Sequence, residues 1–379
     1  MIARLCLSDL HLGDPRSVLS NPEVAAEVAA QLAEISTGAI SELVLNGDVW
    51  EECVPGNMDD RTDGIATSVR HGSQIFFGAL FEKIDVGKVV YVPGNHDLSL
   101  WRWYSRTSLG APTTCTHYNG MEIDRKRWPW SVLFGSSWSG RPLIASYPIY
   151  WDKSVGPDYP LLVFTHGHLL DPLVRGSDPE AEYLALAALG CRRSVLPSDL
   201  TRISALAEVV DDFCSSLWTR YSRRDNTFFN YVMRRIECPQ SCQWQDFVSK
   251  DGYYDVQVSG QNVTDQPPSN QGRLGDVPWF LDLLLGDPDL PSPVGEIGRG
   301  PVGPAFSRPS CLVYGHDHLA ARRTIFAAGV PFTAVGSGGW TSEHDGHLPH
   351  SHVLVWPDVA DVVPRSYFLR ARTSTGTIL

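Results

Sequence analysis

Short apolar runs that stop abruptly at polar residues set the pattern of this chain. Residues 2–7, 43–45, 89–92, 161–164 and 311–314 are such runs, and Asp, Asn or His follows each of them within three residues. Apolar runs of this length are typical of buried β-strands. Because open α/β sheets keep their sites at the carboxyl ends of strands, we expect these polar residues to lie together.

Segments with helical periodicity lie between the early strands. Residues 21–23 (Asn-Pro-Glu) have the features of a helix start, namely an N-cap residue, Pro at the first helical position and an acid in the first turn. Apolar residues follow at helical spacing up to Gly38, and a second amphipathic helix is expected at about 67–84. The alternation of strand and helix predicts an α/β fold.

The later part of the chain adds further strands. Residues 121–141 form short segments rich in Trp and other aromatic residues, which predict antiparallel strands of a second sheet. Residues 330–335 and 352–356 are expected to be strands as well, the second of them the last in the chain.

A long interruption separates the fourth apolar run from the fifth. Residues 180–189 and 199–221 have helical periodicity, whereas the segment after them is rich in Pro, Gly, Asp and Ser. We therefore predict a core of residues 1–170 and 311–379, and an insertion of residues 171–310 with a helical part at about 178–250 and a linker at about 257–309.

Composition and charge narrow the class of protein. The 379 residues are 43% hydrophobic and carry a net charge of −12, which makes nucleic acid a poor partner. The first residues lack a basic and apolar leader, and no run approaches the roughly 18 apolar residues of a membrane span. The eight cysteines are scattered and are expected to be reduced thiols, so we predict a cytoplasmic protein.

The polar residues at the strand ends offer carboxylate, amide and imidazole ligands and no thiolate. This mixture suits a divalent metal such as Mn, Fe or Zn. There are more donors than one tetrahedral metal needs. They suit two metals that lie roughly 3.5–4 Å apart and share a carboxylate, the arrangement that enzymes use for in-line displacement at phosphorus. The residues concerned are Asp9, His11, Asp48, Asn95, His96, His166, His168, His316 and His318.

Five ordered motifs carry a resemblance to the calcineurin-like metallophosphoesterase superfamily. They are Asp-x-His at 9–11, Gly-Asp at 47–48, Gly-Asn-His-Asp at 94–97, a later His at 166 and Gly-His-x-His at 315–318. The resemblance covers roughly residues 1–170 and 311–379. It implies two packed mixed β-sheets flanked by helices, a four-layer αββα sandwich.

The resemblance also implies a role for each site residue. One metal would be held by Asp9, His11 and His318, the other by Asn95, His166 and His316, with Asp48 bridging both. A hydroxide shared by the metals would attack phosphorus, His96 would protonate the leaving oxygen, and Asp97 would orient the His96 ring. Mn is the favoured metal, and the substrate would be a small phosphorylated molecule.

Details of the motifs separate branches of the superfamily. The chain departs from the Ser/Thr phosphatase pattern, because Trp50 and Glu51 follow Gly-Asp-Val and the third motif ends in Asp97. It looks more like bacterial enzymes of the UDP-2,3-diacylglucosamine pyrophosphatase type. Two departures from that type, His168 in place of Asp and the long insertion, leave the substrate open.

Other residues near the motifs have two readings each. Glu51 is either a supporting residue of the site or a cap of its loop, and His168 either contacts substrate or packs. Arg102 could bind a phosphate oxygen or lie on a solvated helix face. The His-rich segment 344–352 is expected to be an exposed loop rather than a third metal site.

The insertion carries a basic and aromatic patch between Trp218 and Ile236. Arg223 and Arg224 lie in it, and the insertion leaves and rejoins the core beside His166 and His316. A helical cap there could bind an anionic head group or rest on an anionic membrane surface, although aromatic packing with solvated arginines is an equally simple reading.

Three functions fit the sequence. The first is a dinuclear hydrolase of a phosphoester or pyrophosphate bond. The alternatives are a non-catalytic binding or scaffold protein on the same fold and a nuclease, and the acidic net charge argues against the nuclease.

Overall fold

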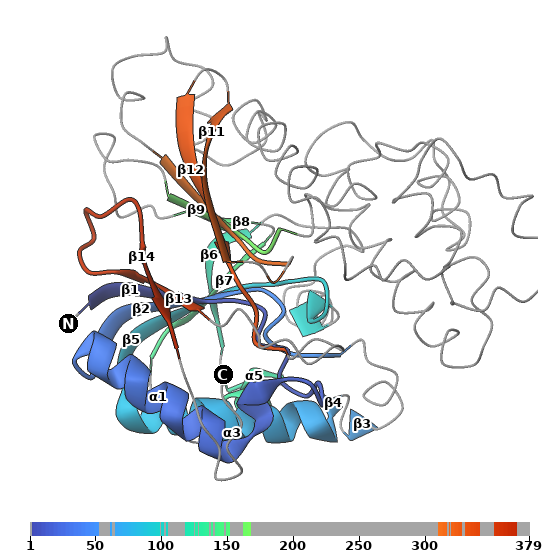
Figure 1. Ribbon diagram of the computed structural model, residues 1–379. Helices are drawn as coiled ribbons and strands as arrows, with labels where there is room; N and C mark the ends of the chain where they lie inside the picture. Colours follow the sequence, from blue (N-terminus) through green and yellow to red (C-terminus); the bar gives the residue numbers. More distant parts are fainter. Residues whose placement is uncertain are drawn as a thin grey trace, which may run out of the picture. The chain divides into compact units, whose positions relative to one another are not determined.

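The apolar runs of the sequence form two β-sheets in the computed structural model of this chain (Figure 1). The described residues belong to the unit formed by Met1–His168 and Pro288–Leu379. They are residues 2–52, 61–62, 65–98, 100–101, 104, 118–124, 126–127, 129–135, 138, 141–147, 149–151, 162–167, 310–316, 318, 320–327, 330–341 and 352–369. The predicted insertion lies outside them, so its boundaries, its helical part and its linker stay predictions.

The first sheet has seven strands. Their order across the sheet is β14 (Arg365–Phe368), β13 (His352–Trp356), β1 (Ile2–Leu7), β2 (Ala39–Asn46), β5 (Asp85–Val92), β7 (Leu143–Tyr147) and β6 (Tyr118–Ile123). Strands β1, β2, β5 and β7 are parallel, while β13 is antiparallel to both of its neighbours and β6 to β7. The carboxyl ends of β1, β2 and β5 therefore meet at one edge.

The second sheet has five strands and is also mixed. Their order is β11 (Ala320–Ala327), β12 (Val330–Ser337), β10 (Ser310–Tyr314), β9 (Leu162–Thr165) and β8 (Ile149–Trp151). Strands β12, β10 and β9 are parallel, and the two outer strands are antiparallel to their neighbours. A separate two-stranded sheet pairs β3 (Arg61–Thr62) with β4 (Ile65–Ala66).

Helices cover the face of the seven-stranded sheet that points away from the second sheet (Figure 1). Helix α1 (Pro22–Ser36) begins as the sequence predicts, because the Asn21 side chain accepts hydrogen bonds from the amides of Glu23 (2.9 Å) and Val24 (3.3 Å). It packs against α3 (Thr67–Lys83). The shorter α5 (Trp130–Leu133) and the 3₁₀ helix η1 (Val18–Ser20) contact α3.

The two sheets pack face to face through one apolar cluster. Cys6, Val44 and Val90 contribute to it from the seven-stranded sheet, and Phe164 and Val313 from the five-stranded sheet. The predicted α/β fold with two packed mixed sheets is confirmed. The described residues show helices beside the seven-stranded sheet, and they do not test the fourth layer of the predicted sandwich.

Residues 121–141 differ from the sequence prediction. The strand at their start, β6, is an edge strand of the first sheet, and α5 follows it. The aromatic residues of this segment pack around the buried Trp50, with Trp130 at 5.8 Å and Phe134 at 5.6 Å between ring centroids. Aromatic side chains favour strands, which is why the sequence predicts strands here, yet Phe134 packs against Phe77 and Phe81 of α3. The strand at 352–356 is likewise not the last, since β14 follows it.

Two further predictions concern thiols and membranes. Cys6 and Cys311 are buried free thiols, in agreement with the expected reduced state. In the part of the chain that the structure describes, no helix combines the length and apolar character needed to cross a membrane.

Candidate metal centre

Backbone hydrogen bonds hold the loops after the strands against one another. The Asp9 amide donates to the Gly47 carbonyl at 3.0 Å, and the His11 amide to the Asp48 carbonyl at 2.8 Å. Across the two sheets, the Trp340 amide, which follows β12, donates to the Asp9 carbonyl, which follows β1, at 3.1 Å. The carboxyl ends of strands from both sheets therefore form one site.

Backbone strain is concentrated in these loops. Among the described residues other than glycine, six have positive φ, and five of the six are candidate site residues: Asp9, His11, Asp48, His316 and His318. This conformation is unfavourable for residues with a side chain, and it is retained where the surrounding structure enforces it. The loops are thus shaped to present these side chains, which is typical of a functional site.

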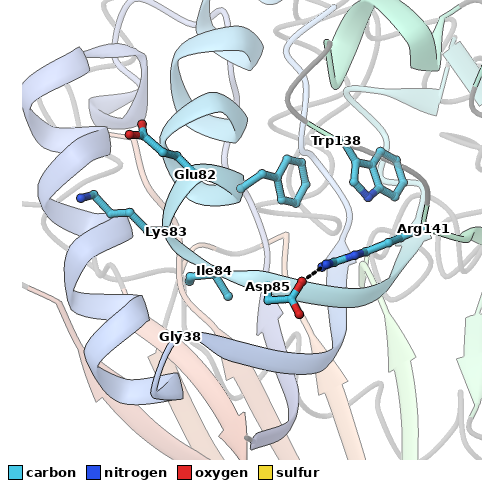
Figure 2. A pocket seen from close by; sticks show the side chains of 8 residues that line it. Gly38, Glu82, Lys83, Ile84, Asp85, Trp138 and Arg141 are labelled. Carbon is cyan, nitrogen blue, oxygen red and sulfur yellow. Dashed lines mark ion pairs between the residues drawn. The ribbon is translucent and has the colours of Figure 1, made fainter.

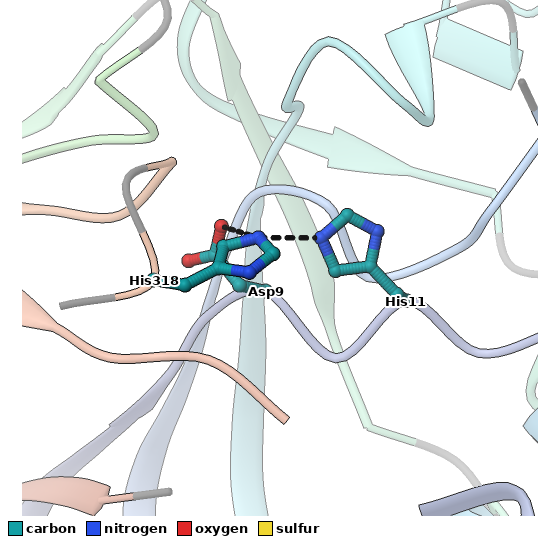
Figure 3. Close-up of side chains that lie close together, drawn as sticks. All are labelled: Asp9, His11 and His318. Carbon is teal, nitrogen blue, oxygen red and sulfur yellow. Dashed lines mark hydrogen bonds and ion pairs between the residues drawn. The ribbon is translucent and has the colours of Figure 1, made fainter. Parts of the chain in front are cut away.

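The first cluster consists of Asp9, His11 and His318 (Figure 3). The Nε2 atoms of His11 and His318 are 3.0 Å apart, and His318 Nε2 is 3.5 Å from Asp9 Oδ1. The other ring nitrogen of His318 contacts the Thr341 hydroxyl at 3.2 Å. Three ligand atoms converge on one point, as a metal ion requires.

The second cluster consists of Asp48, His166 and His316. His166 Nε2 lies 3.0 Å from Asp48 Oδ2 and 3.1 Å from Asn95 Oδ1. His316 Nδ1 lies 3.0 Å from the same Asn95 oxygen. Asn95 therefore joins this cluster, as the sequence predicts.

Asp48 lies between the two clusters. Its Oδ2 atom is 3.7 Å from His11 Nε2 and 4.0 Å from His96 Nε2, in addition to its contact with His166. Its Oδ1 atom accepts a hydrogen bond from the His96 amide at 2.9 Å. A Cβ atom on Gly94 would collide with the Asp48 carboxylate, so glycine is required at that position.

The predicted link between His96 and Asp97 is corrected by the structure. The two Asp97 carboxylate oxygens accept from the amides of Val49 (2.8 Å) and Gly94 (2.7 Å), so Asp97 orders the backbone. Glu51 contacts the His96 ring instead, with Oε1 2.9 Å from Nδ1. The other oxygen of Glu51 lies 2.9 Å from Nδ1 of His11, so one buried carboxylate holds two imidazoles.

The pKa values of the carboxyl groups show how strongly the charges interact. Burial raises the pKa of Asp9 to about 7, and the negative charge of Asp48 adds to this effect. Burial opposes ionisation of Asp48 and Glu51 too, but neighbouring imidazoles outweigh it and hold the pKa of both carboxyl groups well below the usual range.

Two of the four imidazoles in these clusters have pKa values shifted in opposite directions. Burial alone would lower the pKa of His166, but the Asp48 carboxylate raises it to about 9. Burial and the neighbouring His11 hold the pKa of His318 well below its usual range, which favours the neutral ring that binds metals.

The donor set fits divalent metal ions. Asp9 and Asp48 are 0% and 1% exposed, and the negative charge of Asp48 adds to burial in opposing the ionisation of the Asp9 carboxyl group. A cation between such carboxylates would remove this repulsion. The carboxylate, amide and imidazole donors are those that Mn, Fe and Zn share.

Several predicted residues are not covered by this geometry. His168, Arg102, Arg223, Arg224 and the segment 342–351 lie outside the described residues, so their proposed contacts with substrate, metal or membrane stay predictions. Sequence reasoning missed Thr341 and left the role of Glu51 open. The spacing of Glu51, three residues after Asp48 in the same loop, is the signal that could have favoured a supporting role.

A hollow of about 300 Å³ lies at the amino ends of β2 and β5, whereas the site residues follow the carboxyl ends of these strands (Figure 2). Asp85 and Arg141 form an ion pair within it, and Phe81 stacks on Trp138 with ring centroids 5.7 Å apart. None of its eight described lining residues is His or Cys. The metal centre is therefore the better candidate for chemistry.

Comparisons with known proteins were made for the whole chain. No family model matches it, and neither does any curated protein. Among solved structures, it is similar to a dimetal phosphatase from Danio rerio, with 12% sequence identity and a TM-score of 0.34 over 94% of this chain and 92% of that one. A likeness at this level carries no argument about function, which rests on the chemistry of the site.

Proposed function

We propose that this protein is a dinuclear metal-dependent hydrolase that cleaves a phosphoester or pyrophosphate bond of a small phosphorylated substrate. The position of Asp48 Oδ2 carries the proposal. This atom lies 3.0 Å from His166 Nε2 in one cluster and 3.7 Å from His11 Nε2 in the other. A shared carboxylate between two donor clusters is what a pair of metals about 3.5–4 Å apart requires.

The residues of the two clusters divide between two metals. Asp9, His11 and His318 would hold one, and Asn95, His166 and His316 the other, with Asp48 binding both. When bound, the divalent cations would lower the pKa of a shared water and neutralise charge on the phosphoryl group. The donors suit Mn, Fe or Zn, and Mn is favoured because oxygen ligands accompany the imidazoles.

His96 is the proposed general acid. Its Nδ1 atom contacts Glu51, and its side chain is 28% exposed, so the ring can meet a substrate at the mouth of the site. Burial opposes ionisation of Glu51, but the neighbouring His96 and His11 imidazoles outweigh it and hold the pKa of this carboxyl group below its usual range. A ring that is oriented by such a carboxylate can, in its protonated form, deliver a proton to the leaving oxygen.

Glu51 is a positioning residue in this proposal. Because it contacts Nδ1 of both His11 and His96, it directs both Nε2 atoms towards Asp48. The proposed acid and the proposed metal ligand are thus fixed relative to each other by one carboxylate.

The test is turnover and metal content measured on the same preparation. We expect the Mn-loaded protein to contain about two metals per chain and to cleave p-nitrophenyl phosphate, bis-p-nitrophenyl phosphate or members of a phosphorylated-metabolite panel. Absence of turnover on all of them, with two metals bound, would overturn the proposal and favour a non-catalytic protein on this fold.

A further inference from the structure

Arg16 lies in a short loop that follows His11, a member of the first metal cluster, and ends at Ser17, which pairs with Thr341. The Asp14 amide donates to the His11 carbonyl and the Ser17 amide to the Asp14 carbonyl, both at 2.9 Å. Ser17 forms a β-bridge with Thr341, whose hydroxyl contacts His318. Arg16 therefore lies between Asp14, which is bonded to the backbone of His11, and Ser17, which is paired with the residue that contacts His318.

The guanidinium of Arg16 is held in one orientation. Its Nε atom donates to Asp14 Oδ1 at 3.0 Å and its Nη2 atom to Asp14 Oδ2 at 2.6 Å, while the Arg16 amide donates to Oδ1 at 2.8 Å. The Asp14 side chain is 1% exposed, whereas that of Arg16 is 41% exposed. A two-point contact with a buried carboxylate fixes the cation and leaves part of it open to solvent.

Arg16 also lies within electrostatic range of the site. The hydrogen bonds that Arg16 donates to Asp14 raise the pKa of its guanidinium against the opposing effect of burial, and the charge of Glu51 contributes. Glu51 is the carboxylate that contacts His11 and His96, so the Arg16 cation and this part of the site attract each other.

We propose that Arg16 is a specificity-determining residue that binds a terminal phosphoryl oxygen and makes the enzyme prefer phosphomonoesters to phosphodiesters; this rests on the proposed function. A bound monoester has three terminal oxygens and close to two negative charges, whereas a diester has two terminal oxygens and one charge. Two metals can take two of these oxygens. The third oxygen, which only the monoester has, needs a further cationic donor, and a fixed guanidinium suits it.

The test compares kcat/KM for p-nitrophenyl phosphate and bis-p-nitrophenyl phosphate, using the full-length, Mn-loaded chain. We expect Arg16→Ala to lower the value for the monoester about 10- to 100-fold, the loss of one charge-assisted contact, and that for the diester by roughly threefold or less. The control is Arg365→Ala, which removes an exposed arginine of β14 and should leave both values unchanged.

A purely structural role for Arg16 would give a different result. If Arg16 only neutralises the buried Asp14, Arg16→Ala lowers kcat/KM equally for both esters, and that outcome overturns the inference. Because Arg16→Ala leaves Asp14 uncompensated and can unfold the chain, the double variant Asp14→Ala with Arg16→Ala removes both charges. It should show the same selective loss on the monoester.

A binding measurement separates this inference from the hydrolase proposal. The Mn-loaded protein is titrated with inorganic phosphate, which offers the same terminal oxygens as a monoester. We expect Arg16→Ala to weaken phosphate binding about tenfold or more. An inactive wild-type protein whose phosphate affinity still depends on Arg16 would sink the hydrolase proposal alone, whereas phosphate affinity independent of Arg16 would overturn the inference itself.

Discussion

At the scale of single residues, Glu51 links the proposed metal ligand His11 to the proposed general acid His96. It is fully buried and contacts Nδ1 of both His11 and His96. Glutamine at this position would keep the size of the side chain and remove its charge. The orientation of both rings would then lose support.

We therefore expect Glu51→Gln to lower kcat roughly tenfold while the chain keeps most of its metal, since removal of a supporting partner costs less than removal of the acid itself. Asp97→Asn is the informative comparison. If Asp97→Asn lowers kcat and Glu51→Gln does not, the assignment of Glu51 as the orienting carboxylate is wrong.

His96→Ala should remove the proton donor and leave the metals in place. We expect kcat to fall about 100-fold or more for phenyl phosphate, whose leaving group needs a proton, and much less for p-nitrophenyl phosphate. Metal analysis should still find about two ions per chain. An equal loss on both substrates would contradict the role of His96 as an acid.

The sequence predicts the members of the site better than their contacts. Residue types and strand ends bring Asp9, His11, Asp48 and their partners together as expected. The resemblance implies that Asp97 orients the His96 ring, but both Asp97 carboxylate oxygens accept hydrogen bonds from backbone amides. Which carboxylate reaches a ring depends on how two loops fold against each other, and local sequence does not encode that.

At the scale of secondary-structure elements, close packing of the loops decides where the ligands point. A Cβ atom on Gly315 would collide with the side chains of Ser8 and Asp9. Gly315 precedes His316, so the loops after β1 and β10 approach each other at this glycine. The metal cluster containing Asp9 depends on that approach.

We expect Gly315→Ala to displace Asp9 and to reduce the metal content of the chain by about one ion. Gly38→Ala is the control, because Gly38 has positive φ but a Cβ atom there meets nothing within 4 Å. It should cost about 1 kcal/mol of stability and no metal. Full metal content in Gly315→Ala would show that the approach of the loops is not needed.

The elements themselves follow from the sequence where patterns are strong. Helix α1 has its cap at Asn21 and its proline at the first position, and β1 spans the predicted residues. Strand β14 was missed because its four residues, Arg365–Phe368, include two polar side chains and lie at a sheet edge. An edge strand takes part of its stability from its neighbour, in this case β13, which a local pattern does not reveal.

At the scale of the whole described unit, a buried ion pair is enclosed between the two sheets. Arg4 of β1 contacts Glu42 of β2, and Tyr150 of β8 donates a hydrogen bond to Glu42 Oε2 at 3.0 Å. The Arg4 guanidinium lies over the rings of Phe164 and Trp356, at 5.6 and 6.0 Å. The polar contact joins elements of both sheets inside an apolar interface.

We expect Glu42→Ala to lower the free energy of unfolding by about 3–5 kcal/mol, because the buried Arg4 guanidinium would lose the Glu42 carboxylate. Urea unfolding of the metal-loaded protein measures the change. Glu34→Ala, at an exposed position of α1, should change stability by about 0.5 kcal/mol or less. A change of that size in Glu42→Ala would mean that the ion pair contributes little to the packing of the sheets.

The central claim is that Asp48 serves two metals at once, and counting metal ions in Asp48→Ala tests it most directly. We expect the wild-type protein to bind about two ions per chain and His318→Ala about one, because His318 belongs to a single cluster. Asp48→Ala should lose both ions, since its carboxylate lies between the two clusters. Retention of two ions per chain in Asp48→Ala would contradict the account.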